Sequence, residues 1–268
     1  MPTNSLTLTP LCDIPLIQPG DDLGTIILTS LGESSITLQD GDILVLAQKI
    51  VSKAEGRLVN LATVYPSTKA VVYAAETEKD PRLVELILRE SNQVLRTRPG
   101  LIIVEHRRGF VCANAGIDHS NVSPPETSQV SQNLGSLETD DWVLLLPENP
   151  DASAAALRAY LEARTGTRLG VMIIDSHGRA WRNGTVGICI GLSGLPGLAD
   201  LRGQPDLFGY QLRVTEVGVA DELAAAASLV MGQVAEGTPV VHVRGFPYPL
   251  REAELNELLR SKEKDLFR

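Results

Sequence analysis

The order of apolar and polar positions along the chain predicts several short strands. Asp42 is followed by an apolar run to Ala47, which indicates a buried strand, and this run passes into a polar segment, residues 48–53. Residues 101–105 and 110–113 are mostly apolar and flank Arg107, Arg108 and Gly109, a pattern that indicates a hairpin. Two further buried strands are expected at Leu169–Ile174 and Pro239–Val243.

Apolar residues at helical spacing predict the helices. Pro81 follows Asp80, a favourable capping residue, and opens a helix that we expect to run from Arg82 to Arg96. Its apolar positions recur at helical spacing and are Leu83, Leu86, Ile87 and Val94. Three further helices are expected at Ser153–Arg164, Ala220–Met231 and Glu252–Arg268. The first two of these are each closed by a glycine, and the last is charged and amphipathic.

Two segments follow neither period. Residues 123–141 are polar and contain two prolines, which predicts a flexible inserted loop. Residues 183–203 are crowded with glycine and are expected to form a tightly packed irregular loop rather than a phosphate-binding loop, because the Gly-Lys-Ser/Thr ending is missing. Strands and helices otherwise mix without strict alternation. The pattern therefore predicts an α+β fold with mixed sheets and flanking helices, in a single domain of residues 1–268.

Composition narrows the class of protein. The net charge of −9 argues against a nucleic-acid surface, which normally requires a basic face. No apolar run approaches the roughly 20 residues needed to cross a membrane, and the first residues lack the features of a secretory signal. The three cysteines are not spaced as a disulfide framework or a zinc site. We therefore expect a cytoplasmic protein that contacts neither membrane nor nucleic acid.

Two aspartates carry the chemistry that the pattern suggests. Asp118 and Asp175 each stand where an apolar, strand-like run gives way to a polar turn with a glycine nearby. A carboxylate at such a strand end can face a cleft while the preceding residues remain buried. If folding brings the two together, they form an oxygen-rich site for hard divalent cations, and thus for phosphate. The alternative for each is the ordinary role of aspartate in turns and helix caps.

Six short motifs follow one another along the chain and together extend over about residues 10–268. They are Ile14–Ile17 with Pro19–Asp22, Ile50–Arg57, Asn114–Asp118 with Asn121, Asp175–Arg179, Gly191–Gly194, and Met231–Gln233. Together they resemble the coenzyme F420-0:L-glutamate ligases, in the stand-alone form without the C-terminal flavin-binding domain of some relatives.

The resemblance implies a two-lobed fold and an intertwined homodimer. The activity that it implies is the GTP-dependent addition of L-glutamate to coenzyme F420-0 in F420 biosynthesis, with γ-linkage after the first glutamate. The carboxyl group is expected to be activated as an acyl phosphate. The implied cofactors are Mg²⁺ or Mn²⁺, with two ions in the site and K⁺ as a further candidate, and GTP is the co-substrate.

The resemblance also assigns residues to the site. The metal ligands that it implies are Asp118, Asp175, Ser176 and Gln233, all oxygen donors that suit Mg²⁺ or Mn²⁺ better than zinc. The GTP contacts that it implies are Ile14, Pro15, Leu16, Ile17, Gln48, Lys49, Lys53, Asn121, Met231, Gly232, Gln233, Val234, Ala235, Glu236, Gly237 and Thr238. For Lys53 the alternative is a solvated surface lysine, and for Met231–Thr238 it is an ordinary helix end and loop.

Other assignments stay open. Arg179 and Arg182 lie just beyond Asp175 and are candidates for a phosphate or a substrate carboxylate, with solvated surface arginines as the alternative. His119 and His177 lie beside the aspartates, yet the sequence identifies no general base. The loop that follows Asn121 is hypothesised to shape the acceptor pocket. The same carboxylates would also serve a metal-dependent nucleotide phosphohydrolase, or a GTP-binding protein without catalysis.

Overall fold

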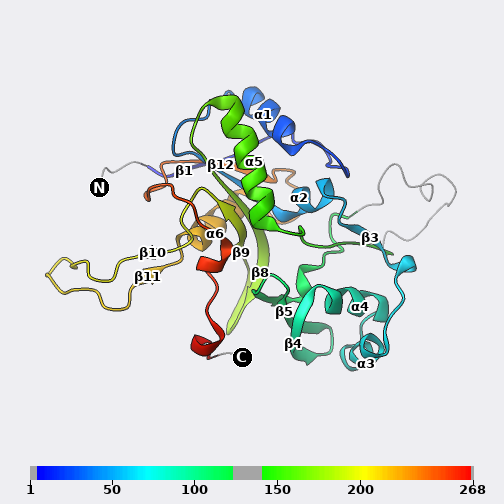
Figure 1. The fold of residues 1–268 in the computed structure, drawn as a ribbon. Coiled ribbons are helices and arrows are strands. Elements are labelled where there is room, and N and C mark those ends of the chain that lie inside the picture. Colours follow the sequence, from blue (N-terminus) through cyan, green and yellow to red (C-terminus); the bar gives the residue numbers. More distant parts are fainter. Residues whose placement is uncertain (1–4, 123–140, 267–268) are drawn as a thin grey trace.

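A computed structural model describes residues 5–122 and 141–266 of the chain (Figure 1). Its largest element is a five-stranded sheet with the strand order β1-β12-β2-β8-β9. These strands are β1 (Thr7–Pro10), β12 (Val240–Arg244), β2 (Ile43–Ala47), β8 (Gly170–Arg179) and β9 (Arg182–Ser193). β2 and β8 run parallel and the other neighbours run antiparallel. The sheet is mixed, and the expected α+β class is confirmed.

Helices cover both faces of this sheet because its central strands are apolar on both sides. Leu44 and Leu46 of β2 belong to one core cluster, and Ile43 and Val45 belong to the other. The first cluster includes residues of α1 (Leu23–Glu33), α2 (Gln48–Ala54) and α5 (Pro150–Thr165). The second includes residues of α6 (Val219–Met231). The side chains of each central strand therefore point alternately into the two core clusters, as the pleat of a buried strand requires.

A smaller three-stranded sheet lies to one side of the large sheet (Figure 1). Its strands are β4 (Ser91–Arg98), β5 (Leu101–His106) and β6 (Val111–Ala113), with α3 (Thr68–Thr77) and α4 (Pro81–Arg89) packed beside them. Ile102 and Val104 of β5 share the first core cluster with Leu44 of the large sheet, so apolar packing is continuous between the two sheets. The remaining strands form two short pairs, β3 (Leu58–Asn60) with β7 (Trp142–Leu144) and β10 (Ala199–Asp200) with β11 (Glu216–Val217).

Several expected elements are confirmed. The strand after Asp42, the hairpin of β5 and β6, and the helices α5 and α6 all form where the pattern places them, within a few residues. Gly166 and Gly232 follow α5 and α6 as expected. The expected loop of residues 123–141 lies outside the described residues except for Asp141, whose carboxylate pairs with Arg82.

The helix expected from Arg82 to Arg96 is too long, because α4 ends at Arg89 and β4 begins at Ser91. Glu90 explains the change, since its side chain is buried and pairs with Arg57 and Arg107. The backbone of Glu90 also accepts a hydrogen bond from Arg107 N. These tertiary contacts fix the chain at this point, and local spacing of apolar residues cannot reveal them.

The prediction of an irregular loop at residues 183–203 is also wrong, because most of this segment forms the long strand β9. Its glycines serve helix packing: a Cβ at Gly187 would lie 2.6 Å from Ala224 O of α6, and one at Gly191 would lie 2.4 Å from Pro150 Cβ of α5. The two helices can therefore approach β9 closely on its two faces.

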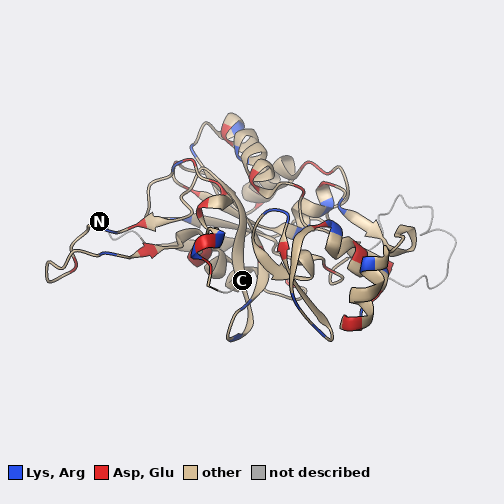
Figure 2. Ribbon diagram, turned by 60° about the horizontal axis from the view of Figure 1, so that its bottom comes forward, with Lys and Arg blue, Asp and Glu red and all other residues tan. Residues whose placement is uncertain are grey.

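The amphipathic helix expected over the C-terminal tail does not form in the part of the tail that is described. Two short 3₁₀ turns, Leu255–Glu257 and Lys262–Lys264, stand in its place. Glu257 accepts hydrogen bonds from Gly197 N and Arg251, so its contacts tie the tail to the loop after β9. Among the described residues, no helix is long and apolar enough to cross a membrane. Basic and acidic positions are interspersed along the elements seen in Figure 2.

Candidate functional site

The site begins where two parallel strands lie side by side. Ala47, the last residue of β2, pairs with Ile174 of β8. The next residues are Gln48, at the start of α2, and Asp175 of β8, and they therefore lie at the same height along the two strands. This is the edge at which open α/β sheets usually present their functional groups.

Asp118 lies in the segment after β6 and reaches Gln48 at this edge of the sheet. Its backbone forms a two-way hydrogen-bonded bridge with Leu144. Gln48 Nε2 donates to Asp118 Oδ2 at 2.8 Å, and Lys49 Nζ lies 3.1 Å from the same oxygen. The chain around Asp118 contains three non-glycine residues with positive φ, at 50° for Asn114, 54° for Ala115 and 57° for Asn121. Such backbone strain tends to collect at functional sites.

The two aspartates, far apart in sequence, interact electrostatically. Burial raises the pKa of the Asp118 carboxyl above its usual range, the charge of Lys49 opposes the rise, and the charge of Asp175 adds to it. The charge of Asp175 also adds to the rise that burial causes in the pKa of the Cys112 thiol on β6. Both shifts follow if Asp175 lies on the side of β8 that faces the segment of residues 112–118.

Asp175 does not stand at a strand end, as the sequence suggested. β8 continues to Arg179, and Asp175 pairs with Ile188 of β9 inside the hairpin. The strand continues because the expected glycine-rich loop is itself β9, which supplies the partner strand. Asp175 is therefore held by backbone pairing rather than placed in a turn.

Ser176 and Gln233 form a second oxygen-bearing pair. Ser176 Oγ donates to Gln233 Oε1 at 2.9 Å, and Gln233 Nε2 donates to Ser228 Oγ of α6 at 2.9 Å. Successive residues of a strand point to opposite faces, so Ser176 lies on the α6 side, while Asp175 lies on the other. Of the four implied metal ligands, Ser176 and Gln233 are thus joined on one face of β8, while Asp175 points to the other face and its charge acts on Asp118.

The segment after α6 meets the segment after Asp118. Asn121 Nδ2 donates to Val234 O at 3.1 Å, and Lys49 Nζ donates to Ser120 O at 2.9 Å. Within the first of these segments, Thr238 Oγ1 donates to Met231 O at 3.0 Å and Val234 N donates to Glu236 Oε2 at 2.8 Å. Residues implied as nucleotide contacts in three distant parts of the sequence are therefore brought together.

Lys53 lies one helical turn after Lys49 on α2. Burial lowers the pKa of the Lys53 ammonium group, and the neighbouring charge of Lys49 lowers it further. A nearby anion would offset this desolvation. No salt bridge of Lys53 is found among the described residues, so an anionic ligand would be its natural partner.

The two candidate arginines and the segment Ile14–Ile17 remain apart from this cluster. Arg179 and Arg182 are exposed at the turn between β8 and β9, where Arg179 Nη2 donates to Asn183 O. Four residues of extended strand place Arg179 about 13 Å beyond Asp175. Among the hydrogen bonds of the described residues, none joins Ile14–Ile17 to either aspartate, and Leu16 of that segment is 87% exposed.

The donors suit a hard cation that keeps some of its water. In the described part of the chain, no group of three or more His, Cys, Asp or Glu residues is arranged to hold a metal. Two carboxylates with neutral oxygens and a phosphate nevertheless form the usual environment of Mg²⁺. Because the charges of Asp118 and Asp175 repel each other, a divalent cation between them would relieve that repulsion.

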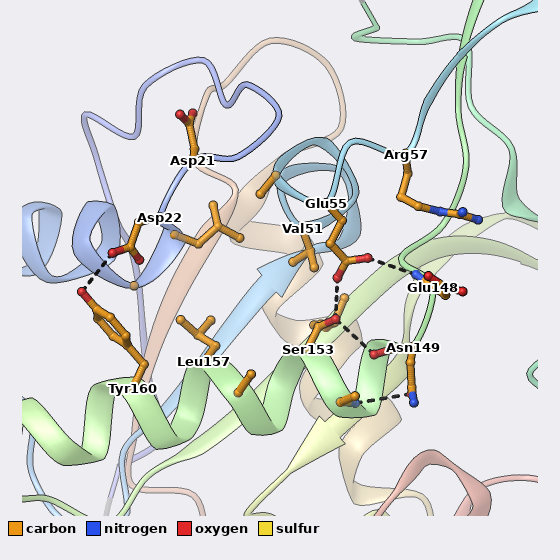
Figure 3. A pocket seen from close by; sticks show the side chains of 16 residues that line it. Asp21, Asp22, Val51, Glu55, Arg57, Glu148, Asn149, Ser153, Leu157 and Tyr160 are labelled. Carbon is orange, nitrogen blue, oxygen red and sulfur yellow. Dashed lines mark hydrogen bonds between the residues drawn. The ribbon is translucent and has the colours of Figure 1, made fainter.

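A cavity of about 730 Å³ lies elsewhere on the α5 side of the sheet (Figure 3). Asp22 accepts a hydrogen bond from Tyr160 at one end, and Glu55 accepts one from Glu148 N at the other. Ile173, two residues before Asp175 on β8, contributes to its wall. Sequence reasoning missed this cavity, although two of the six motifs, Pro19–Asp22 and Ile50–Arg57, contribute to its lining, because the motifs do not show that α5 and β8 complete a common wall with them.

The sequence matches a known protein family over most of its length. The family described as F420-0:gamma-glutamyl ligase matches residues 12–245. The chain belongs to this family. The coenzyme F420:L-glutamate ligase of Methanothermobacter thermautotrophicus is 45% identical over 257 residues, which cover 95% of this chain and 96% of the relative.

Two further relatives have the same name and similar coverage. The coenzyme F420:L-glutamate ligase of Methanopyrus kandleri is 44% identical over 256 residues, 94% of this chain and 93% of its own. That of Archaeoglobus fulgidus is 41% identical over 259 residues, 97% of this chain and 95% of its own. The resemblance carried by the six motifs is confirmed, and membership of the F420-0:gamma-glutamyl ligase family extends over nearly the whole chain.

Proposed function

We propose that the protein joins L-glutamate to coenzyme F420-0 through an amide bond, with GTP as the source of energy. The observation that carries the proposal is the likeness to coenzyme F420:L-glutamate ligases over at least 94% of this chain in the three relatives named above. The ion pair of Lys49 with Asp118, the charge of Asp175 acting on Asp118, and the half-buried Lys53 one turn after Lys49 support the phosphate chemistry.

Amide formation in water requires an activated carboxyl group. In the proposed reaction a carboxylate oxygen of F420-0 attacks the γ-phosphorus of GTP, the bond from that phosphorus to the bridging oxygen breaks, and GDP leaves. The amine of glutamate then attacks the acyl carbon, phosphate departs with the electron pair of the C–O bond, and the amine proton passes to phosphate or solvent. A second cycle would use the side-chain carboxyl of the attached glutamate.

The residues of the chain would bind and orient the reactants. Asp118 and Asp175, with Ser176 and Gln233 on the other face of β8, would hold Mg²⁺ or Mn²⁺, which supplies positive charge to the phosphate oxygens. Lys49 and Lys53 would place ammonium groups on the phosphates. The backbone of residues 231–238 and the Asn121 amide would bind the nucleotide, because the hydrogen bond of Asn121 to Val234 already joins these segments.

The test combines purified protein with GTP, Mg²⁺ or Mn²⁺, L-glutamate and F420-0. The proposal expects the mass of the acceptor to rise by one or more glutamyl units while GDP and phosphate appear in equal amounts. GTP consumption that requires neither glutamate nor acceptor would instead indicate a nucleotide phosphohydrolase. GTP binding without consumption in the complete mixture would indicate a non-catalytic binding protein.

We also propose a homodimer in which the arm of residues 199–217 contacts the second subunit. This arm contains β10 and β11 and projects from the body of the protein (Figure 1). At its tip Leu207 is 98% and Phe208 is 95% exposed. Adjacent large apolar side chains in open solvent are typical of interaction surfaces.

A further inference from the structure

The carboxylate of Asp175 is bound by a buried histidine on its own strand. His177 Nε2 lies 2.9 Å from Asp175 Oδ2, and the two residues point to the same face of β8 because they are two positions apart. His177 is only 7% exposed. Oδ2 of Asp175 is therefore engaged, and among the hydrogen bonds of the described residues none is made to Oδ1.

The ring of His177 is fixed by an aromatic column. Phe110 packs against it with ring centroids 5.6 Å apart, and His106 stacks on Phe110 at 4.7 Å and nearly parallel, at 9°. His106 in turn lies beside the buried Glu90. The imidazole of His177 has little freedom to turn away from Asp175, because its neighbours are themselves held in place.

The hydrogen-bonding pattern indicates which nitrogen carries the proton. His177 Nδ1 is buried and has no hydrogen-bond partner among the described residues. A ring nitrogen without a hydrogen at that position costs less free energy than a buried N–H donor without an acceptor. With Nδ1 bare, the ring carries a hydrogen on Nε2 and donates it to the Asp175 carboxylate.

We propose that His177 is a positioning residue, which holds the Asp175 carboxylate in the orientation that a divalent cation requires. The inference rests on the proposed function, in which Asp175 is a metal ligand. Repulsion from Asp118 favours rotation of Asp175 away from the site before the cation binds, and the His177 N–H opposes that rotation. Hydrogen bonds to ligating carboxylates commonly have this effect, and their loss weakens metal binding about tenfold to a hundredfold.

The experiment measures Mn²⁺ affinity directly, from the electron paramagnetic resonance signal of free Mn²⁺, with GTP present and without acceptor. His177→Leu keeps the bulk of the ring but removes the donor, and should weaken Mn²⁺ binding by about tenfold to a hundredfold. His177→Gln retains an N–H at a similar reach and should recover most of the affinity. The matched control is His242→Leu, since His242 is buried and also contacts an aspartate at 2.9 Å, Asp42, in another part of the sheet.

The outcomes separate this inference from the proposed function. Wild-type Mn²⁺ affinity in a folded His177→Leu protein overturns the role of His177 and leaves the ligase proposal standing. Failure of the wild-type protein to bind Mn²⁺ in the presence of GTP overturns the metal site itself, and the role of His177 with it. An equal loss of affinity in His242→Leu shows a general effect of destabilisation and also overturns the inference.

A measurement on the unaltered protein covers the case in which His177→Leu does not fold. Nitrogen-15 spectra of histidine-labelled protein report the tautomer of His177, with the resonance assigned through His177→Gln. The expected state is protonated at Nε2 and bare at Nδ1, with a shift of the Nε2 resonance when Mg²⁺ and GTP are added. The opposite tautomer, or resonances that Mg²⁺ and GTP do not move, would rule out the positioning role.

Discussion

Gln48 donates a hydrogen bond from Nε2 to Asp118 Oδ2 at 2.8 Å across 70 positions of the sequence. Gln48 is almost fully buried, and its own oxygen accepts a hydrogen bond from Ser52 Oγ at 2.9 Å. The amide is therefore fixed at both ends. The start of α2, which directly follows β2, thereby holds Asp118 beside the β8 strand that carries Asp175.

The first prediction concerns Asp118. Asp118→Asn removes one charge and nearly no volume, so the protein should fold as before while ligase activity falls by about a thousandfold, on the order of 4 kcal/mol in transition-state stabilisation. Initial rates of GDP release at saturating GTP, glutamate and F420-0 measure the effect. Asp40→Asn, at an exposed position before β2, is the matched control and should retain full activity. Near-normal turnover in Asp118→Asn would contradict a direct role for this carboxylate.

The second prediction concerns Lys53, the proposed phosphate contact. Lys53→Ala should lower kcat/KM for GTP by about tenfold to a hundredfold, because a hydrogen bond to a charged group contributes roughly 1.5–3 kcal/mol. Lys79 provides the control, since burial lowers the pKa of its ammonium group too, but Lys79 lies after α3 in the smaller part of the fold. Lys79→Ala should leave kcat/KM unchanged. Similar kinetic losses in the two variants would indicate that general destabilisation, rather than phosphate binding, is responsible.

The sequence could predict the elements whose signal is local. β2 and α6 each show one clear apolar pattern, and the glycine after α6 marks its end. β9 could not be predicted, because Gly187 and Gly191 are required by helices packed against them from distant parts of the chain. The length of α4 depends on the pairing of Glu90 with Arg57 and Arg107, which likewise arises only in the folded protein.

The candidate site shows the same division. Its residues could be proposed individually from motifs, but the motifs could not show that Asp175 lies inside a strand or that Ser176 points to the opposite face. The contacts of His177 with Phe110 and of Gln48 with Asp118 depend on tertiary packing. Local sequence shows which residues are chemically suitable, and the sheet register shows which of them can meet.

The third prediction concerns the close packing of α6 on β9. A side chain at Gly187 would place Cβ 2.5 Å from Ser228 Cβ and 2.6 Å from Ala224 O, so Gly187→Val should destabilise the protein by about 1–3 kcal/mol or more. Chemical denaturation measures the change. Gly178→Val lies in the same hairpin, where an added Cβ meets nothing within 4 Å and φ is not positive, and it should change stability little. Equal stability of the two variants would show that α6 can move away from β9 without cost.

The fourth prediction concerns the buried carboxylate at the other end of β2. Burial alone would raise the pKa of Asp42, but hydrogen bonds from Arg244 and His242 outweigh it and hold the pKa below its ordinary value of 3.8. A lowered pKa contributes stability that is complete above the ordinary value and is lost as the pH falls through the folded-state value. Asp42→Asn should therefore cost stability at pH 7, and the difference from the wild type should shrink below about pH 4.

Denaturant titrations of both proteins between pH 7 and pH 2.5 measure this difference. Asp40→Asn, at the neighbouring exposed position, should show no comparable trend. A difference between wild type and Asp42→Asn that stays constant down to pH 2.5 would show that the charge of Asp42 is not what stabilises the pair.

The last prediction concerns the arm of residues 199–217. If its exposed tip contacts a second subunit, the double substitution Leu207→Asp and Phe208→Asp should place charge in that contact and shift the protein from dimer to monomer. The arm is held at its base by the pairing of Ala199 with Val217 and by Arg202 between Asp200 and Glu216, so the fold of each subunit should survive. Sedimentation velocity at several concentrations measures the state of association. A wild-type protein that is monomeric throughout, or a variant that dimerises as tightly as the wild type, would assign the exposed tip some other role.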